Sequence, residues 1–173
     1  ITNKFTYKGV IVSFLIDIKK GGDVFSTDLY YGLSTGIYPE TAGNNDLGNP
    51  LRNAIADGGG IIRPGVTADG KANTIRAEAV NYGAYGYRYA PDKAFVYDAG
   101  YVKLREASIG YALPKKIFHN GTIKGVEFSL VGRNLWIIHK NLPYADPEEG
   151  FSSGNLQGIQ TGAYPTVRAI AFN

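Results

Sequence analysis

The stretch YVKLREASIGYALPKK at residues 101–116 decides the fold class. In its second half, Ile109 and Tyr111 alternate with small or polar residues, which is the pattern of a strand with one apolar face. In its first half the pattern conflicts, because Lys103 and Arg105 fall on the same parity as Ile109. Two explanations remain open: a β-bulge reverses the parity, or this end of the strand lies outside the apolar layer.

Three other segments alternate in a similar way, so we expect strands at about residues 7–18, 97–113, 123–138 and 166–173. Most of these segments exceed the ordinary globular strand of about five to six residues. They match membrane-spanning strands, which need about 9–11 residues. The sequence therefore predicts an all-β fold, and within it a segment of a transmembrane antiparallel β-barrel.

The connections between these strands alternate in length. Residues 114–122 form a short connection, whereas residues 19–96 and 139–165 form two long ones. Because outer-membrane barrels have short periplasmic turns and long extracellular loops, we expect the two long connections to be outer loops. Within the first of them, residues 49–56 and 74–82 are candidates for short helices. Four strands cannot close a barrel, which needs about eight, so the sequence predicts part of a larger barrel.

The composition excludes several classes of protein. The 173 residues carry a net charge of +3, which argues against a nucleic-acid-binding domain with its clustered basic stripe. The 23 glycines, 13% aromatic residues and 19% charged residues disfavour disorder and helical bundles. The absence of cysteine excludes disulfides and thiol nucleophiles. Since no nucleophile–base pair or metal-ligand spacing is present either, we expect neither an enzyme nor a cofactor or metal site.

Tyrosines crowd the first long loop. A tyrosine side chain offers an apolar ring and a hydroxyl, which suits the surface of a sugar or a peptide. The alternative is that the rings pack the loop against itself or against a partner protein. The candidate substrate-binding residues are Tyr30, Tyr31, Tyr38, Tyr85, Tyr87 and Tyr89, with Tyr82 in the same loop.

Parity along the strands assigns two further sets of residues. One set is expected to face the barrel lumen, where it either lines a polar conduit or forms structural ion pairs with neighbouring strands. It consists of Glu106, Glu127 and Arg133. The other set is aromatic, with a spacing that would put one ring at each interface of an apolar band of about 25 Å. It consists of Tyr101, Tyr111, Phe128 and Trp136.

The second long loop carries an acidic cluster of Asp146, Glu148 and Glu149. Oxygen-rich loops can bind calcium, but the spacing here lacks the pattern D-x-[DN]-x-[DN]-G of a calcium loop. We therefore expect these carboxylates to be solvated loop charges.

Taken together, several stretches resemble SusC/RagA-type TonB-dependent outer-membrane transporters. The resemblance lies first in the stretch 101–116 quoted above. Several shorter motifs add to it, and each of them alone is a weak signal, whereas their combination in this order is specific. The further pieces are Phe14-Leu15-Ile16-Asp17-Ile18, Gly21-Gly22-Asp23, Gly132-Arg133-Asn134-Leu135-Trp136, Lys140-Asn141, Asp146-Pro147-Glu148 and Tyr164-Pro165-Thr166.

The resemblance implies a multi-pass β-barrel protein of the bacterial outer membrane, in contact with lipid and lipopolysaccharide. Members of the family are 22-stranded barrels with an N-terminal plug, and the TonB–ExbB–ExbD system energises them. They pair with a SusD-like surface lipoprotein and import oligosaccharides or peptides. On this basis residues 1–173 are the C-terminal part of such a barrel and supply its last four strands, next to the remainder of the barrel and the plug. TonB would be reached through an N-terminal region outside this sequence.

The alternative is a secreted soluble β-sandwich that binds glycans through its tyrosine-rich loop. The two hypotheses differ in the surroundings of the apolar side chains. In a sandwich, a second sheet would cover Val10, Phe14, Phe128 and Leu130, whereas in a barrel these residues would face lipid.

Overall fold

The computed structural model describes residues 1–80, 84–85, 90–118, 122–123, 125–150, 156–162 and 164–173. The chain divides into two compact units. The first, here called the sheet unit, comprises Ile1–Asp23, Asp98–Glu149 and Ala163–Asn173. The second, the loop unit, comprises Val24–Tyr97 and Gly150–Gly162. In the part of the chain that the structure describes, we find no helix long and apolar enough to cross a lipid bilayer.

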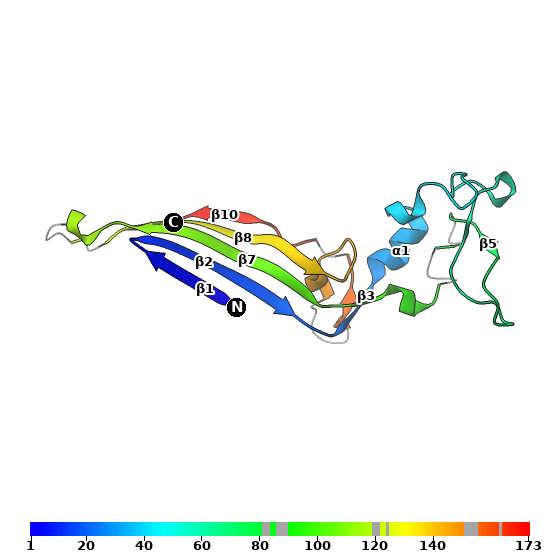
Figure 1. Ribbon diagram of the computed structural model, residues 1–173, viewed down its shortest axis with the longest axis horizontal. Helices are drawn as coiled ribbons and strands as arrows, with labels where there is room; N and C mark the ends of the chain where they lie inside the picture. Colours follow the sequence, from blue (N-terminus) through cyan, green and yellow to red (C-terminus); the bar gives the residue numbers. More distant parts are fainter. Residues whose placement is uncertain (81–83, 86–89, 119–121, 124, 151–155, 163) are drawn as a thin grey trace. The chain divides into compact units, whose positions relative to one another are not determined.

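The sheet unit is built on an antiparallel sheet of five strands in the order β1-β2-β7-β8-β10 (Figure 1). The strands are β1 (Thr2–Tyr7), β2 (Val10–Lys19), β7 (Tyr101–Ala112), β8 (Glu127–Lys140) and β10 (Ala169–Phe172). The two ends of the sequence thus supply the two edges of the sheet.

The sheet contains one strand more than the four that the alternation predicted. The segment expected at 7–18 begins at Val10, and β1 precedes it in a hairpin. The two turn residues, Lys8 and Gly9, have φ angles of 47° and 87°, as two-residue hairpin turns of this hand require. A side chain at position 9 would also lie 2.9 Å from the carbonyl oxygen of Ala112, so the turn needs glycine. The hairpin was not predicted from the sequence, because the turn lacks the Asn-Gly or Asp-Gly pair that usually marks such a turn.

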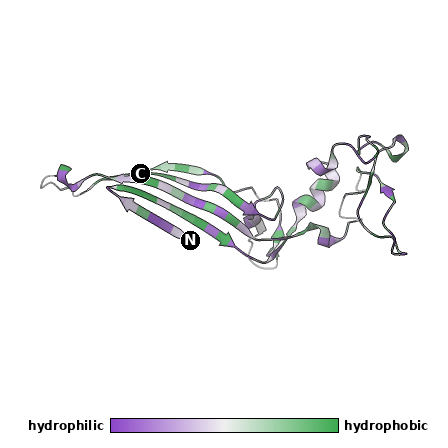
Figure 2. Cartoon of the chain, viewed as in Figure 1, coloured by the Kyte–Doolittle hydropathy of each residue, from purple (hydrophilic) through white to green (hydrophobic). Residues whose placement is uncertain are grey.

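One face of the sheet, here called the apolar face, carries large apolar side chains from all five strands. Figure 2 shows hydrophobic and hydrophilic residues following one another along the strands. Residues that are paired across the strands share a face, and the pairs Val12–Ile109 and Ile109–Leu130 set the register. Most of the side chains on this face are exposed within the chain, from 39% for Val12 to 76% for Ile170. The face consists of Phe5, Tyr7, Val10, Val12, Phe14, Ile16, Ile18, Leu104, Ile109, Tyr111, Phe128, Leu130, Trp136, Ile170 and Phe172.

A β-bulge at Arg105 resolves the conflict in the first half of β7. Leu15 of β2 pairs with Glu106 and Ile16 pairs with Leu104, so Arg105 is the extra residue of β7. The pairing with β8 shifts at the same place. An extra residue reverses the side to which all following residues of the strand point. Lys103 therefore lies on the polar face of the sheet, whereas Ile109 lies on the apolar face. Of the two explanations left open by the sequence, the bulge is confirmed.

The loop unit is organised around a helix and a small sheet. Strands β6 (Val96–Asp98), β3 (Asp23–Ser26) and β9 (Ile159–Gln160) lie in that order, and α1 (Thr27–Thr35) directly follows β3. Strands β4 (Ile61–Ile62) and β5 (Arg76–Ala77) form a separate hairpin. Among the described residues of both units, the short 3₁₀ helices are Pro39–Thr41, Ile55–Asp57, Asp92–Phe95, Lys115–Ile117 and Pro147–Gly150. A core of Leu51, Ala79, Ala84 and Tyr85 holds the unit together.

The helices predicted inside the first loop are wrong. Where a helix was predicted over residues 49–56, the chain forms turns and then a three-residue 3₁₀ helix at Ile55–Asp57. Where one was predicted over 74–82, the described residues contain no helix, and Arg76–Ala77 form the strand β5. The helix that does form, α1, is capped at its N-terminus by Ser26, whose hydroxyl accepts a hydrogen bond from the Leu29 amide at 3.2 Å. It ends at Gly36, which has a φ angle of 80°.

Candidate functional site

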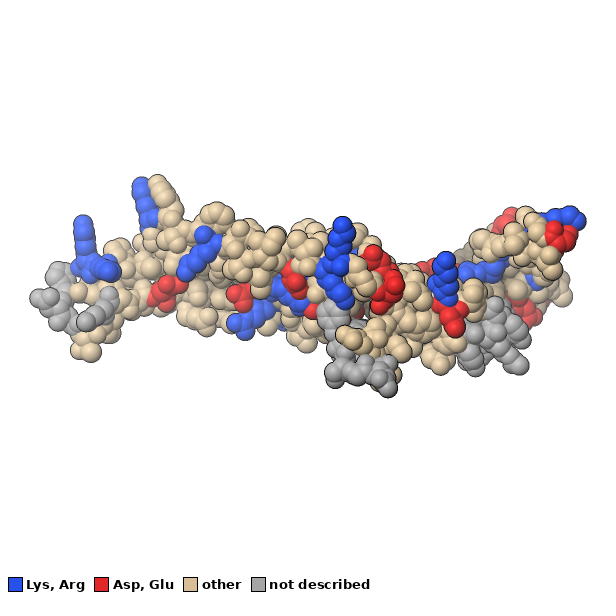
Figure 3. Space-filling model, turned by 90° about the horizontal axis from the view of Figure 1, so that it is seen from below, with Lys and Arg blue, Asp and Glu red and all other residues tan. Residues whose placement is uncertain are grey.

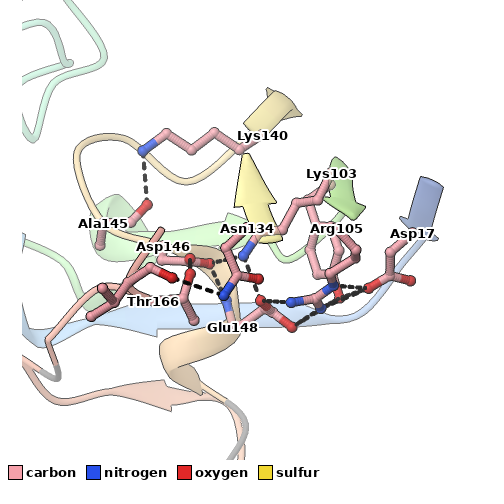
Figure 4. A network of polar contacts seen from close by, with 11 residues as sticks. Asp17, Lys103, Arg105, Asn134, Lys140, Ala145, Asp146, Glu148 and Thr166 are labelled. Atoms are coloured by element: carbon pink, nitrogen blue, oxygen red, sulfur yellow. Dashed lines mark hydrogen bonds and ion pairs between the residues drawn. The ribbon is translucent and has the colours of Figure 1, made fainter. Parts of the chain in front are cut away.

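The polar face of the sheet carries a cluster of charged side chains at one end of β2 and β7. Asp17 of β2 lies directly opposite Lys103 of β7, and the bulge at Arg105 turns this arginine to the same side. The segment after β8 adds two carboxylates. We call the set the charge cluster, and its charged members are Asp17, Lys103, Arg105, Asp146 and Glu148 (Figure 4). The Tyr101 hydroxyl, which donates to Asp17, completes the cluster.

Each cation of the charge cluster contacts two carboxylates. The Lys103 ammonium donates to Asp146 and, at 2.5 Å, to Glu148. The Arg105 guanidinium donates from Nη2 to Asp17 at 2.7 Å and from Nη1 to Glu148 at 2.7 Å. Glu148 is thus shared by both cations. The side chains of Lys103 and Asp146 are only 5% and 4% exposed, so this ion pair is buried in the sheet unit.

Burial and pairing act in opposite directions on the two loop carboxylates. Burial by itself would raise the pKa of Asp146, but hydrogen bonds from Lys103, the Glu148 amide and the Thr166 hydroxyl outweigh it and lower the pKa. Burial would likewise raise the pKa of Glu148, and the hydrogen bonds from Arg105 and Lys103 lower it instead. Both carboxylates are therefore held in the charged form.

Two predictions about these residues need correction. Asp146 and Glu148 are not solvated loop charges, because they fold back onto the sheet and pair with Lys103 and Arg105; the side chain of Glu149 lies outside the described residues. Tyr101 does not share a face with Tyr111 as an interface ring would. The bulge places it on the polar face, where it is 4% exposed and its hydroxyl donates to Asp17 at 3.0 Å.

The charge cluster joins stretches of sequence that are far apart. Lys103 and Arg105 belong to the stretch 101–116, and their partners belong to Asp146-Pro147-Glu148. Thr166, which precedes β10, donates to Asp146 at 3.0 Å. The alternation of charge along β7 was visible in the sequence, but the pairing required the bulge and could not be read from spacing. Since every described charge in the cluster has an opposite partner, the cluster is suited to holding the chain in place.

A separate ion pair joins the lumen-facing candidates. Arg133 Nε donates to Glu106 Oε2 at 3.0 Å, across β7 and β8 on the polar face. Both side chains are substantially exposed, which makes this pair weaker than the charge cluster. Glu127 lies on the same parity, opposite Ala112 of β7. This cross-strand contact fits the structural interpretation of these charges, while lumen exposure itself stays a prediction.

The remaining interface candidates lie on the apolar face. Tyr111 pairs with Phe128, and Trp136 pairs with Leu104. The sequence analysis missed two aromatic contacts on this face: Phe128 stacks on Phe172 with ring centroids 6.1 Å apart, and Phe5 stacks on Phe14 at 6.2 Å. Both join an edge strand to its neighbour.

The structure separates the loop tyrosines into two groups. Tyr30 is half-buried and packs against Phe25 and Phe95, with ring centroids 5.3 and 5.0 Å apart, and its ring also meets that of Tyr31 edge-on at 5.0 Å. Tyr85 is 4% exposed, and its hydroxyl donates to the Glu40 carbonyl at 2.7 Å. Tyr31 and Tyr38, by contrast, line a groove beside α1. Tyr82, Tyr87 and Tyr89 lie outside the described residues.

Charges on the surface are mixed. On the face drawn in Figure 3, the described acidic and basic side chains are interspersed. The described residues contain no group of three or more histidine and acidic side chains that could hold a metal ion.

Comparison with known proteins finds a similarity in sequence to a TonB-dependent receptor and in fold to a peptide transporter. Over 84 residues, 45% of this chain, the sequence is 35% identical to the TonB-dependent receptor P3 of Formosa agariphila. The fold matches solved structures of the RagAB peptide transporter, with a TM-score of 0.58 and 19% identity, and of the RagAB peptide importer in its open-open state, with a TM-score of 0.58 and 17% identity. Each match covers 99% of this chain. No protein-family model matches the chain.

These matches confirm the resemblance to SusC/RagA-type TonB-dependent transporters. The chain is mostly β and matches part of the RagAB fold. It spans 8% of the length of the receptor P3 and 16% of the length of the RagAB chains. The proteins it matches are receptors and transporters rather than enzymes.

Proposed function

We propose that this chain is the C-terminal barrel segment of a TonB-dependent transporter in the bacterial outer membrane, which imports oligosaccharides or peptides with a SusD-like lipoprotein as partner. The observation that carries the proposal is the pair of unlike faces on one sheet. Large apolar side chains are exposed on one face, and the described charges of the charge cluster are paired on the other.

The apolar face is too large to be an ordinary water-exposed surface. Soluble monomeric proteins rarely expose a contiguous apolar patch of more than a few hundred Å². Here the patch crosses five strands, and its side chains point away from the polar face of the same sheet. Lipid tails would cover it without cost, because hydrocarbon is as apolar as leucine. The exposure of Val10, Phe128 and Leu130 within this chain also disfavours the soluble sandwich.

The edges of the sheet support a larger barrel. β1 pairs on one side with β2, and β10 pairs on one side with β8, so each edge strand has backbone groups directed away from the sheet. In a bilayer these groups need hydrogen-bond partners, since each unpaired one costs several kcal/mol. The neighbouring strands of the same barrel would supply them.

The polar face then lines the lumen, and the charge cluster fixes the second long loop to the barrel wall. Asp146 and Glu148 hold this loop through Lys103 and Arg105. In this arrangement the residues 19–96 and 139–165 are extracellular, where they would contact the substrate and the lipoprotein. The plug, TonB and the remaining strands would come from other parts of the transporter.

The proposal is tested on the full-length protein in cells. It should fractionate with the outer membrane, and it should take up a labelled oligosaccharide or peptide only when TonB and an energised inner membrane are present. A strain without TonB, which still makes the protein, is the control. Recovery of the protein as a soluble monomer in the absence of detergent would refute the proposal.

A further inference from the structure

The loop unit contains a groove of 660 Å³ beside α1. One wall comes from α1 and includes Asp28, Tyr31 and Thr35, and the other includes Tyr38 and Gly162. All of these residues belong to the loop unit. The groove therefore lies within one compact part of the chain, and its walls are positioned by that part alone.

Asp28 gives the groove its charge. Among the described residues that line the groove, it is the only charged one. Its Oδ2 accepts a hydrogen bond from the side-chain amide of Gln160. The other carboxylate oxygen, Oδ1, faces the groove wall at Gly162, since a side chain at position 162 would come within 3.1 Å of it. A carboxylate in a groove whose described lining holds no cation is complementary to a positively charged ligand group.

Gln160 positions this carboxylate. It is fully buried, and its Oε1 accepts a hydrogen bond from the Ser26 hydroxyl at 2.7 Å. Its backbone carbonyl accepts another from Thr27. Because β9 also pairs with β3 in register at this residue, Gln160 cannot turn without breaking these contacts. The groove is therefore pre-organised, which lowers the entropy lost on binding.

The other side chains of the groove suit a peptide. Tyr31 is 54% exposed, and an aromatic ring attracts a cation within about 6 Å of its centroid. The Thr35 hydroxyl donates to the Gly32 carbonyl at 3.1 Å, which leaves its oxygen as an acceptor for an amide N–H. Ile37, which also lines the groove, is 71% exposed and offers an apolar contact.

We propose that this groove binds a cationic peptide, with a terminal ammonium or a basic side chain of the peptide against Asp28 and Tyr31. The inference rests on the proposed function and names the substrate class at one of its outer loops. A neutral sugar would leave the carboxylate without a cation, and an acidic peptide would be repelled by it.

The test measures binding by titration calorimetry on the full-length protein in detergent. The probes are the tripeptide Lys-Ala-Lys, acetylated Gln-Ala-Gln, which has no cation, and maltotriose. We expect Lys-Ala-Lys to bind at least tenfold more tightly than the other two probes. Asp28→Asn should weaken its binding at least tenfold, and raised salt should weaken it in the wild type. The matched control is Asp92→Asn, which removes an acidic residue that is not among those lining the groove, from the first turn of another helix of the loop unit.

The inference is overturned if Lys-Ala-Lys does not bind, if Asp28→Asn binds it as the wild type does, or if maltotriose binds more tightly. Uptake of labelled Lys-Ala-Lys by cells keeps the two proposals apart. TonB-dependent uptake that Asp28→Asn leaves unchanged would refute the groove and leave the transporter standing. Binding that depends on Asp28 without any TonB-dependent uptake would refute the transporter and leave the groove standing.

Discussion

The two faces of the five-stranded sheet differ in how their side chains are stabilised. On the apolar face, Ile109 and Leu130 lie next to each other and are 56% and 49% exposed, so much of their surface has no contact within the chain. On the polar face of the same sheet, Lys103 is 4% exposed and is held by two carboxylates, those of Asp146 and Glu148. The first face depends on its surroundings being apolar, and the second depends on individual partners. The effect of a substitution on stability should therefore depend on apolar surface area on the apolar face and on charge on the polar face.

The largest effect should follow from removal of the buried cation. Lys103→Met leaves Asp146 and Glu148 without their shared partner, and removal of one member of a buried ion pair costs about 3–5 kcal/mol. The free energy of unfolding of the full-length protein, measured by denaturant titration in detergent micelles, should fall by this amount. Lys115→Met, at an exposed lysine, is the matched control and should change it by less than about 0.5 kcal/mol.

A second variant sharpens this prediction. Addition of Asp146→Asn to Lys103→Met removes the orphaned charge, so the double variant should be more stable than Lys103→Met alone. Equal stability of Lys103→Met and the wild type would mean that the charge cluster does not hold the sheet unit together.

The next largest effect should distinguish the two faces directly. Leu130→Arg puts a charge on the apolar face, where arginine in an outer-membrane barrel costs from about 1 kcal/mol near the interface to about 2–4 kcal/mol at the middle of the bilayer. Ser129→Arg puts the same side chain on the neighbouring residue, which points to the polar face, and should cost much less. The readout is the yield of folded protein in the outer membrane and its unfolding free energy in lipid. The same loss for both variants would contradict the assignment of the faces.

Acid should weaken the polar face and spare the apolar one. Asp146 and Glu148 have lowered pKa values in the folded protein, from ordinary values of 3.8 and 4.5, so the unfolded chain binds more protons at acidic pH. Their contribution to stability is complete above the ordinary values and is lost as the pH falls through the lowered ones. We expect the unfolding free energy to drop below about pH 4.5, and the drop to be smaller in Asp146→Asn. A drop of the same size in this variant would assign the acid sensitivity to other carboxylates.

The smallest effect should come from the exposed pair of the polar face. Arg133 is 67% exposed, so the loss of its contact with Glu106 in Glu106→Gln should cost about 0.2–1 kcal/mol at most. Salt should reduce this difference between the variant and the wild type, because exposed charges are screened. A loss comparable to that of Lys103→Met would show that burial does not govern the strength of these pairs.

The long strands could be predicted from the sequence because each has one apolar face. The alternation in β2 and in the second half of β7 reports that face directly, and a structural ion pair for Glu106 and Arg133 was among the alternatives. The predictions that failed concerned features that depend on residues elsewhere in the chain. The face on which Tyr101 lies depended on the bulge further along the same strand, at Arg105. The burial of Asp146 depended on its contact with Lys103, which is 43 residues away in the sequence.

The loop unit was harder to predict because few of its elements have a periodic pattern. The helix α1 has the sequence TDLYYGLST, in which apolar and polar residues do not form a clear stripe, and its ends are set by Ser26 and Gly36. Those two caps were the available signal. The different surroundings of Tyr30 and Tyr31, whose rings contact each other, were not predictable, because they depend on which ring meets Phe25 and Phe95.

The extra residue at Arg105 also constrains how this strand can change in evolution. A loss of Arg105 itself would leave Lys103 opposite Asp17 on the polar face, whereas the loss of one residue between Arg105 and Ile109, with the bulge retained, would carry Lys103 to the apolar face and leave its acidic partners behind. Insertions and deletions on either side of Arg105 are therefore tolerated most easily in pairs. A shift of the bulge along β7 would move the boundary between the apolar and the charged residues of this strand without any change in the number of strands.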